Sequence, residues 1–179
     1  MDELSLGLRL CIGSIFIGTF IDKIQNFISH MGVVRSYRIV PENILRPLVY
    51  VEITLELIIG IGMILGIMVN FMNLIAAFLI SLYAFAMIIN LIRGNYDLSC
   101  GCGGILGDSK ISWKLVIRNI VFLLVVIFMN YSPHELGTVD AYLKLGNISV
   151  LYNESVLYIV TTFVLLYAFI LVLRAFVRL

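Results

Sequence analysis

Charged residues are scarce in this chain. They make up 13% of its 179 residues, whereas soluble domains carry about 25%. Proline is rare as well, with three residues, so long apolar stretches run without a helix breaker. Hydrophobic residues account for 61% of the sequence, and the mean hydropathy is +1.08. The shortage of charge excludes an ordinary soluble domain, and the sequence therefore predicts an integral membrane protein.

Two further features are missing. The formal net charge is +1, and no basic stripe gathers enough lysine and arginine to neutralise a run of phosphates, which argues against a nucleic-acid partner. The first residues, MDELSLGLRL, begin acidic and lack both a basic n-region and a small-residue cleavage site. We expect them to start a retained membrane span rather than a signal peptide.

Five apolar runs are long enough to cross a membrane as helices, and they cover residues 6–28, 48–69, 71–92, 113–131 and 156–177. The predicted fold class is all-α integral membrane, a four-helix transmembrane bundle plus a fifth C-terminal transmembrane helix. A short hinge at Asn70 predicts an antiparallel hairpin, and Pro41 and Pro47 predict a break with a short interfacial segment before the second span. We divide the chain into a membrane domain, 1–131, carrying the cysteine loop 93–112, and a C-terminal part, 132–179.

The basic residues predict an orientation. Most would lie on the side of the cysteine loop: Lys23, Arg35, Arg38, Arg46, Arg93, Lys110, Lys114, Arg118, Arg174 and Arg178, against Arg9 and Lys144 on the other side. Because cytoplasmic loops carry an excess of lysine and arginine, this distribution places the cysteine loop at the cytoplasmic face of the cell membrane.

The motif SCGCGG raises the question of what two cysteines do one residue apart. Cys100 and Cys102 are flanked by glycines that can adopt positive φ. A disulfide across one residue needs a tight turn, should be strained, and constrains the unfolded chain little, so the pair suits redox exchange better than bracing. Inert thiols and metal binding remain alternatives, although the chain offers few further ligands and we expect no metal site. Cys11 is expected to be a small buried residue.

Ionisable residues also occur inside the predicted spans. Glu52 and Glu56 are four residues apart and share one helix face. Two buried carboxylates require a cation, and Lys23 and Arg118 are the expected partners. The cluster either fixes helix packing or forms a polar pocket under the cysteine loop. Aromatics such as Phe78, Tyr83 and Phe85 are interpreted as lipid-facing or core residues, and His30 and His134 as loop residues without a role.

An ordered set of segments resembles the MauE and DoxX family of redox-associated membrane proteins, above all its MauE branch. The segments are FIDKIQNF, YRIVP, ITLELIIG and NLIRGNYDLSCGCGGILGDSKISWKLVIRN, and the resemblance covers residues 6–131. The branch has an acidic residue before Cys-x-Cys-Phe-Gly, then a tryptophan and an Arg-Asn pair; here Gly103 replaces the aromatic residue, and Phe20 stands where a small residue often precedes the lysine. The resemblance places the following residues on the family's recurring polar positions: Lys23, Glu56, Arg93, Asp97, Cys100, Cys102, Trp113, Arg118 and Asn119.

The resemblance implies a bundle related to membrane disulfide-forming proteins, acting with a thioredoxin-like partner in disulfide formation or maturation of exported proteins. That role would place the cysteines outside the cell, against the charge distribution. We expect a thiol-disulfide oxidoreductase in which Cys100 and Cys102 are catalytic. A second electron acceptor is needed, and a membrane quinone is expected near Lys23, Glu56, Arg93, Trp113, Arg118 and Asn119. The alternative is a non-catalytic assembly factor or membrane anchor that docks a redox protein or a metal.

Overall fold

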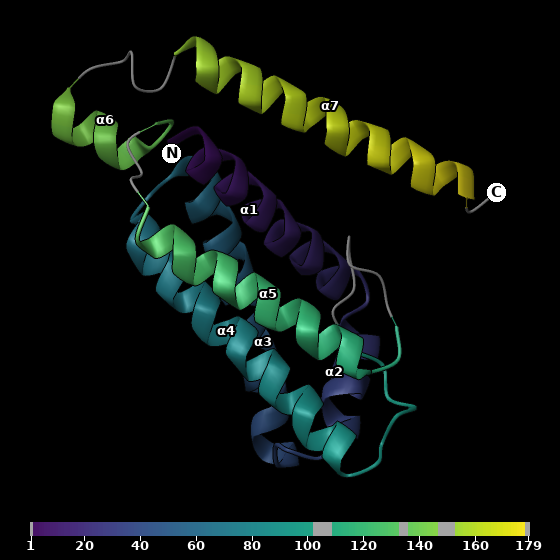
Figure 1. The fold of residues 1–179 in the computed structure, drawn as a ribbon. Coiled ribbons are helices and arrows are strands. Elements are labelled where there is room, and N and C mark those ends of the chain that lie inside the picture. The colour runs from purple at the N-terminus through teal and green to yellow at the C-terminus, as the bar shows by residue number, and fades with distance from the viewer. Residues whose placement is uncertain (1, 102–108, 133–135, 147–152, 178–179) are drawn as a thin grey trace.

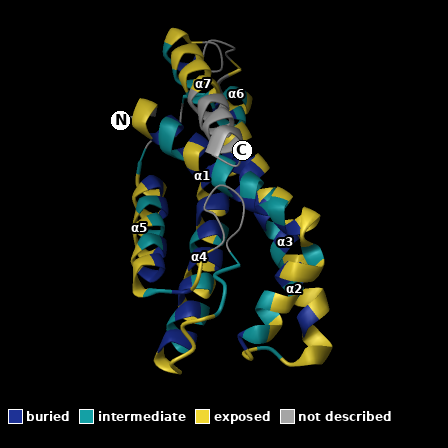
Figure 2. Ribbon diagram, turned by 90° about the vertical axis from the view of Figure 1, so that its right-hand side faces the viewer, coloured by how far each residue is buried: buried dark blue, intermediate teal, exposed yellow. Residues whose placement is uncertain are grey.

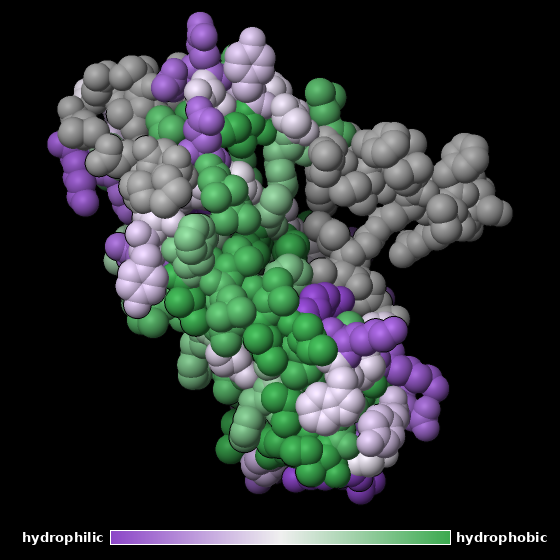
Figure 3. Space-filling view, viewed as in Figure 1, coloured by the Kyte–Doolittle hydropathy of each residue, from purple (hydrophilic) through white to green (hydrophobic). Residues whose placement is uncertain are grey.

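The computed structural model describes residues 2–101, 109–132, 136–146 and 153–177. Helices dominate these residues (Figure 1): α1 (Asp2–Gln25), α2 (Phe27–Ser36), α3 (Glu42–Leu65), α4 (Val69–Ile92), α5 (Trp113–Asn130), α6 (Val139–Leu145) and α7 (Glu154–Val177). Four of them, α1, α3, α4 and α5, are long and apolar enough to span a membrane. On the face shown in Figure 3, hydrophobic side chains cover the middle of the bundle and hydrophilic ones gather toward its ends. The chain is therefore a multi-pass membrane protein, as its composition predicts.

The C-terminal helix differs from these four. Its described apolar part, Glu154–Leu165, is shorter than a membrane span. Leu6 and Leu10 of α1 form a small hydrophobic cluster with Val156, which fixes the start of α7 beside the start of α1. A fifth transmembrane helix therefore stays a prediction.

Two boundaries differ from those expected. The turn between α3 and α4 lies at Gly66 and Met68, both in the left-handed region (φ 69° and 47°), while Asn70 is already inside α4. Gly66 suits this turn because a residue without Cβ adopts positive φ at little cost. At the other end, Pro41 is the N-cap residue of α3 and Pro47 lies within the helix, so the second span begins at Glu42.

Close packing of α1 on α3 sets the position of the site. A Cβ atom on Gly13 would lie 3.1 Å from the carbonyl oxygen of Gly60, and one on Gly60 would lie 3.2 Å from that of Gly13. Small residues let two membrane helices approach in this way. The glycine run of the second span thus brings the two helices together, and with them Lys23 and the two glutamates.

Helices α3 and α4, by contrast, diverge toward the end of the bundle where α2 lies (Figure 2). The cysteine loop, between α4 and α5, lies at this same end. Its inner side packs in a second hydrophobic cluster, in which Leu98 and Cys100 contact a group of buried residues: Tyr37, Met87, Leu91, Ile111, Leu115 and Val116.

Candidate functional site

Three charged side chains meet inside the bundle, near the cysteine end. The Lys23 Nζ atom lies 2.5 Å from Glu52 Oε1 and 2.7 Å from Glu56 Oε1. Lys23 is 2% exposed, and Glu56 is buried as well. The predicted contact between Lys23 and the two glutamates is confirmed. Because ions lose hydration on burial, such a group is tolerated only when opposite charges and hydrogen bonds replace the lost water.

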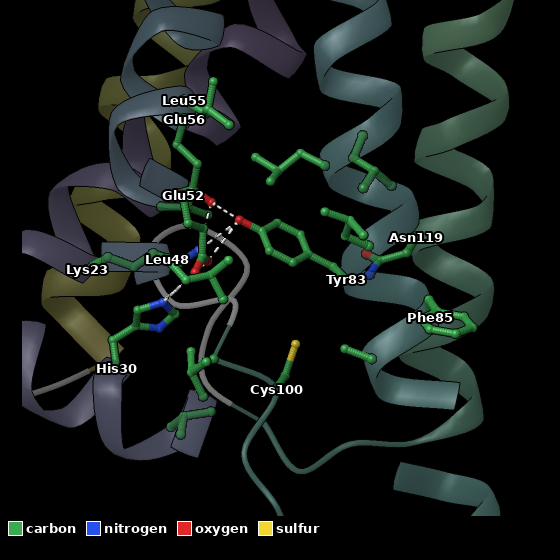
Figure 4. A pocket seen from close by; sticks show the side chains of 18 of the residues that line it. Lys23, His30, Leu48, Glu52, Leu55, Glu56, Tyr83, Phe85, Cys100 and Asn119 are labelled. Carbon is green, nitrogen blue, oxygen red and sulfur yellow. Dashed lines mark hydrogen bonds and ion pairs between the residues drawn. The ribbon is translucent and has the colours of Figure 1, made fainter. Parts of the chain in front are cut away.

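Tyr83 and His30 extend this group. The Tyr83 hydroxyl is 2.9 Å from Glu52 Oε1 and 2.7 Å from Glu56 Oε1, and it donates to these carboxylates. His30 Nε2 lies 3.3 Å from the Glu52 carboxylate. The interpretation of His30 as a loop residue without a role is therefore wrong, because it lies in α2 and contacts Glu52. Tyr83, interpreted as a lipid-facing or core residue, is half-buried and turns its hydroxyl to the glutamates. We call Lys23, His30, Glu52, Glu56 and Tyr83 the charge cluster (Figure 4).

The charge cluster forms one wall of a cavity of about 540 Å³. The volume lies within the usual range for small-molecule and cofactor sites, which are mostly apolar with a few converging polar groups. Most of the lining is aliphatic or aromatic, and the polar lining residues outside the charge cluster are Thr19, Tyr37, Cys100 and Asn119. Cys100 lies across the cavity from the charge cluster in Figure 4. The cavity therefore brings a cysteine and a buried ionic network to one space.

The cavity reaches the molecular surface between α3 and α4. Some of its lining residues are also exposed large apolar side chains: Leu48 and Val51 from α3, and Phe78, Leu82 and Phe85 from α4. These residues lie in membrane-spanning helices. The opening between them, which we call the side opening, therefore faces lipid.

Two polar atoms in the cavity wall have no hydrogen-bond partner in the described part of the chain, Glu56 Oε2 and Asn119 Nδ2. An unsatisfied buried polar group costs about 1–3 kcal/mol. Both atoms are buried, so a ligand in the cavity could bond them only after the Glu56 or Asn119 side chain turned toward it.

Cys100 is disulfide-bonded, and Cys102 lies outside the described residues. The base of the cysteine loop is closed by an antiparallel bridge between Ser99 and Lys110, with Cys100 N donating to Ser109 O at 2.8 Å. The Tyr37 hydroxyl donates to the carbonyl oxygens of Ser99, at 3.0 Å, and Cys100, at 3.2 Å. These contacts hold Cys100 against the cavity. His134, for which no role was expected, also lies outside the described residues.

The other predicted site residues lie elsewhere. Among the described residues that line the cavity are Lys23, Glu56, Cys100 and Asn119, whereas Arg93, Trp113 and Arg118 are not among them. Trp113 is 53% exposed at the start of α5. Arg118 Nε and Nη2 are buried without a hydrogen-bond partner in the described segments, so the structure does not pair Arg118 with the glutamates.

Asp97 forms an exposed ion pair with Lys110 across the base of the cysteine loop, with Lys110 Nζ 2.7 Å from Asp97 Oδ1. The hydrogen bond and the positive charge of Lys110 lower the pKa of the Asp97 carboxyl, and Asp97 in turn raises the pKa of Lys110. At the base of the cysteine loop, the pair thus presents one acidic and one basic side chain to water.

A second buried cation lies at the opposite end of α1. Arg9 is 1% exposed and donates from Nη2 to the carbonyl oxygen of Gly137 at 2.6 Å, while its Nε has no partner among the described residues. Arg9 is not among the described residues that line the cavity. Cys11, expected to be buried, is exposed and is a free thiol.

Comparison with known proteins gives one family. The family model described as "Methylamine utilisation protein MauE" matches residues 1–132. The methylamine utilization protein MauE of Paracoccus denitrificans is 29% identical over 114 residues, which cover 64% of this chain and 61% of that protein. Its counterpart in Methylorubrum extorquens is 36% identical over 99 residues, covering 55% of this chain and 53% of that protein. The chain thus spans between half and two thirds of these relatives' length. No solved structure matches.

Proposed function

This chain belongs to the MauE family, and we propose that it is a membrane thiol-disulfide oxidoreductase acting in methylamine utilisation. Cys100 and Cys102 alternate between dithiol and disulfide. A thioredoxin-fold partner exchanges with this pair in disulfide formation or maturation of exported proteins. A membrane quinone takes up the electrons.

The observation that carries the proposal is the position of Cys100. Its sulfur belongs to a disulfide, lies on a loop at the end of the bundle, and faces a cavity that contains an ionic network. A disulfide between Cys100 and Cys102 would close a very short ring and stabilise the fold little, so bracing the loop is a weak reason for it. In redox exchange, the loop meets the thioredoxin-fold partner on the side that faces water. It meets a lipid-soluble electron acceptor on the side that faces the cavity.

The cavity suits a quinone in shape and chemistry. Its walls outside the charge cluster are mostly apolar and its side opening faces lipid. The side chains of Asn119 and Glu56 carry a donor suited to a quinone oxygen and an acceptor suited to a hydroquinone hydroxyl, and no described residue uses either. A bound quinone supplies an acceptor for two electrons and two protons. Asn119 would donate from its amide to one quinone oxygen, while Tyr83 and Lys23 hold the two neighbouring carboxylates in place.

The two half-reactions balance. The dithiol of the partner reduces the disulfide of the pair, so that the partner leaves as a disulfide and the pair becomes a dithiol. The pair then loses both S–H bonds and regains its S–S bond. Its two electrons and two protons leave with the quinone as hydroquinone.

The test uses purified protein in lipid discs, a reduced thioredoxin and a short-chain benzoquinone, with hydroquinone formation followed by absorbance. We expect turnover by the unsubstituted chain and none by Cys100→Ser. Cys11→Ser is the matched control, because that thiol is exposed on α1 and away from the cavity lining, and it should keep full turnover. If Cys100 stays oxidised with every thioredoxin-fold donor and no hydroquinone forms, the non-catalytic assembly or anchoring role replaces this proposal.

A further inference from the structure

His30 joins the cysteine loop to the charge cluster. It lies in α2 and is 8% exposed. Its Nε2 is 3.3 Å from the Glu52 carboxylate. Its other edge faces the loop, since a Cβ atom built on Gly101 would lie 3.6 Å from His30 Nδ1 and 3.7 Å from Cε1. The ring therefore has one nitrogen toward the buried carboxylate and the other toward the residue next to Cys100.

The backbone around Gly101 makes this approach specific. Gly101 has φ +66°, and a Cβ atom there would lie only 3.0 Å from Val33 of α2. A side chain at this position would be strained by the backbone and would push α2 away. The glycine thus keeps the loop in contact with the helix that carries His30.

Beyond His30 the contacts are continuous. Glu52 bonds Lys23 at 2.5 Å and Tyr83 at 2.9 Å, and both of these reach Glu56 at 2.7 Å. The groups that face His30 are thus Glu52 of α3, with Lys23 of α1 and Tyr83 of α4 behind it, and the cysteine loop on the other side. Glu56 ends the series, with Oε2 unpartnered in the cavity wall.

We propose that His30 is the base that accepts the proton of the reduced Cys100 thiol and passes it through Glu52 into the charge cluster. The inference deepens the proposed function and rests on it. When the disulfide re-forms, the Cys100 S–H bond breaks, its proton reaches Nδ1 across the cavity that both residues line, and a proton on Nε2 can pass to Glu52. The electrons stay on sulfur until they leave with the quinone, whose oxygens take up the protons. Imidazole suits this task because it binds and releases protons at two separate nitrogens.

The experiment measures how reactive the Cys100 thiol is, which needs neither partner nor quinone. In a Cys11→Ser/Cys102→Ser background in lipid discs, a small neutral maleimide alkylates Cys100, and the rate is recorded from pH 5.5 to 9.5. Only the thiolate reacts, so the profile reports how readily Cys100 loses its proton. With His30 present we expect appreciable alkylation already near pH 6.5.

His30→Gln is the informative variant, because its amide nitrogen can still donate to Glu52 but cannot accept a proton. At pH 7 the rate should fall about tenfold, and above pH 9 it should converge with that of the His30 protein, where the thiol ionises unaided. Tyr37→Phe is the control for loop position. It removes the hydroxyl that holds the Ser99 and Cys100 carbonyls and should change the rate by the same factor at every pH.

A His30→Gln profile that overlays the His30 profile, or one displaced by a constant factor like that of Tyr37→Phe, would overturn the role of His30. Hydroquinone formation is then compared in the chain that keeps both loop cysteines. There His30→Gln should be slow near pH 7 and recover at alkaline pH. If the alkylation result holds while no quinone is reduced by any variant, the proposed function fails and the proton acceptor at His30 stands.

Discussion

Helix α1 carries two buried cations, and they differ in almost every other respect. Arg9 and Lys23 are 14 positions apart in the sequence, or roughly 21 Å along a helix at 1.5 Å per residue. Lys23 bonds two carboxylates inside a cavity, and Tyr83 donates to the same carboxylates. Arg9 bonds one backbone carbonyl, that of Gly137, near the start of α6. Burial of a charged side chain alone therefore does not identify a functional site in this protein. The bonding partners of the side chain and the presence of a cavity beside it distinguish Lys23 from Arg9.

Arg118 of α5 differs from both of these cations. It is a basic residue in a membrane span, and it was expected to share the role of Lys23. In the structure two of its guanidinium nitrogens are buried without a partner in the described residues, and it is not among the described residues lining the cavity. If the partners and the space around a cation decide its role, substitutions near Lys23 should change turnover and substitutions near Arg9 should not.

Removal of the cation at the cavity should have the largest effect. Lys23→Met leaves Glu52 and Glu56 buried without an opposite charge and should lower stability by about 3–5 kcal/mol. The measurement is unfolding of the purified protein in detergent. Combining it with Glu52→Gln and Glu56→Gln should recover most of the stability, because no buried carboxylate is then left without an opposite charge. Hydroquinone formation should stay absent, because the reaction still requires the charged side chains. Equal losses in the single and the triple variant would contradict an ionic origin.

The matching substitution at the other end should be milder and functionally silent. Arg9→Met leaves the Gly137 carbonyl without its donor and should cost about 1–3 kcal/mol of stability. Hydroquinone formation and Cys100 alkylation should both match those of the unsubstituted chain. A loss of turnover in correctly folded Arg9→Met would remove the distinction between the two cations.

Tyr83→Phe should lower both the stability of the protein and its turnover. It removes one hydroxyl that donates to the glutamates, so stability should drop by about 1 kcal/mol. We expect hydroquinone formation to fall about tenfold, corresponding to about 1.4 kcal/mol of transition-state stabilisation. Tyr50→Phe is the control, because Tyr50 is exposed on α3 and stacks near Phe27. Equal turnover in the two variants would exclude a role for the Tyr83 hydroxyl.

The exposed pair of the cysteine loop should give the smallest effect. Lys110→Gln removes the hydrogen bond and charge that lower the pKa of Asp97, so this pKa should return to the ordinary carboxyl range, as carboxyl NMR titration can measure. A lowered folded-state pKa stabilises the fold above the unfolded-state pKa, and this contribution is lost as pH falls through the folded-state value. Since both groups are fully in water, the melting temperature at neutral pH should not change measurably. A clear decrease would show that the pair holds the loop closed.

The sequence predicted the spanning helices and the Lys23 contact with the glutamates, because apolar run length and residue spacing on a helix are local properties. It did not predict His30, since Pro41 and the polar residues around it suggested a loop, whereas the chain turns at Asn26 and continues as α2. Spacing along one helix could not link His30 to Lys23, because α1 ends at Gln25 and α2 begins at Phe27. Tyr83 was missed because aromatic residues are common in membrane spans, and only the divergence of α3 from α4 exposes its hydroxyl to a cavity.

The side opening of the cavity between α3 and α4 has a consequence for any ligand of this site. A ligand that enters through this opening comes from the bilayer, so the rate at which it binds follows its mole fraction there, not its concentration in the buffer. The length of a ligand's apolar tail and the polarity of its headgroup then affect binding first through its partitioning into the bilayer. Its contacts with the cavity walls act only afterwards. Apparent affinities will therefore change with the amount of lipid or detergent in the sample, and two ligands with identical contacts will differ in potency whenever they dissolve differently in the membrane.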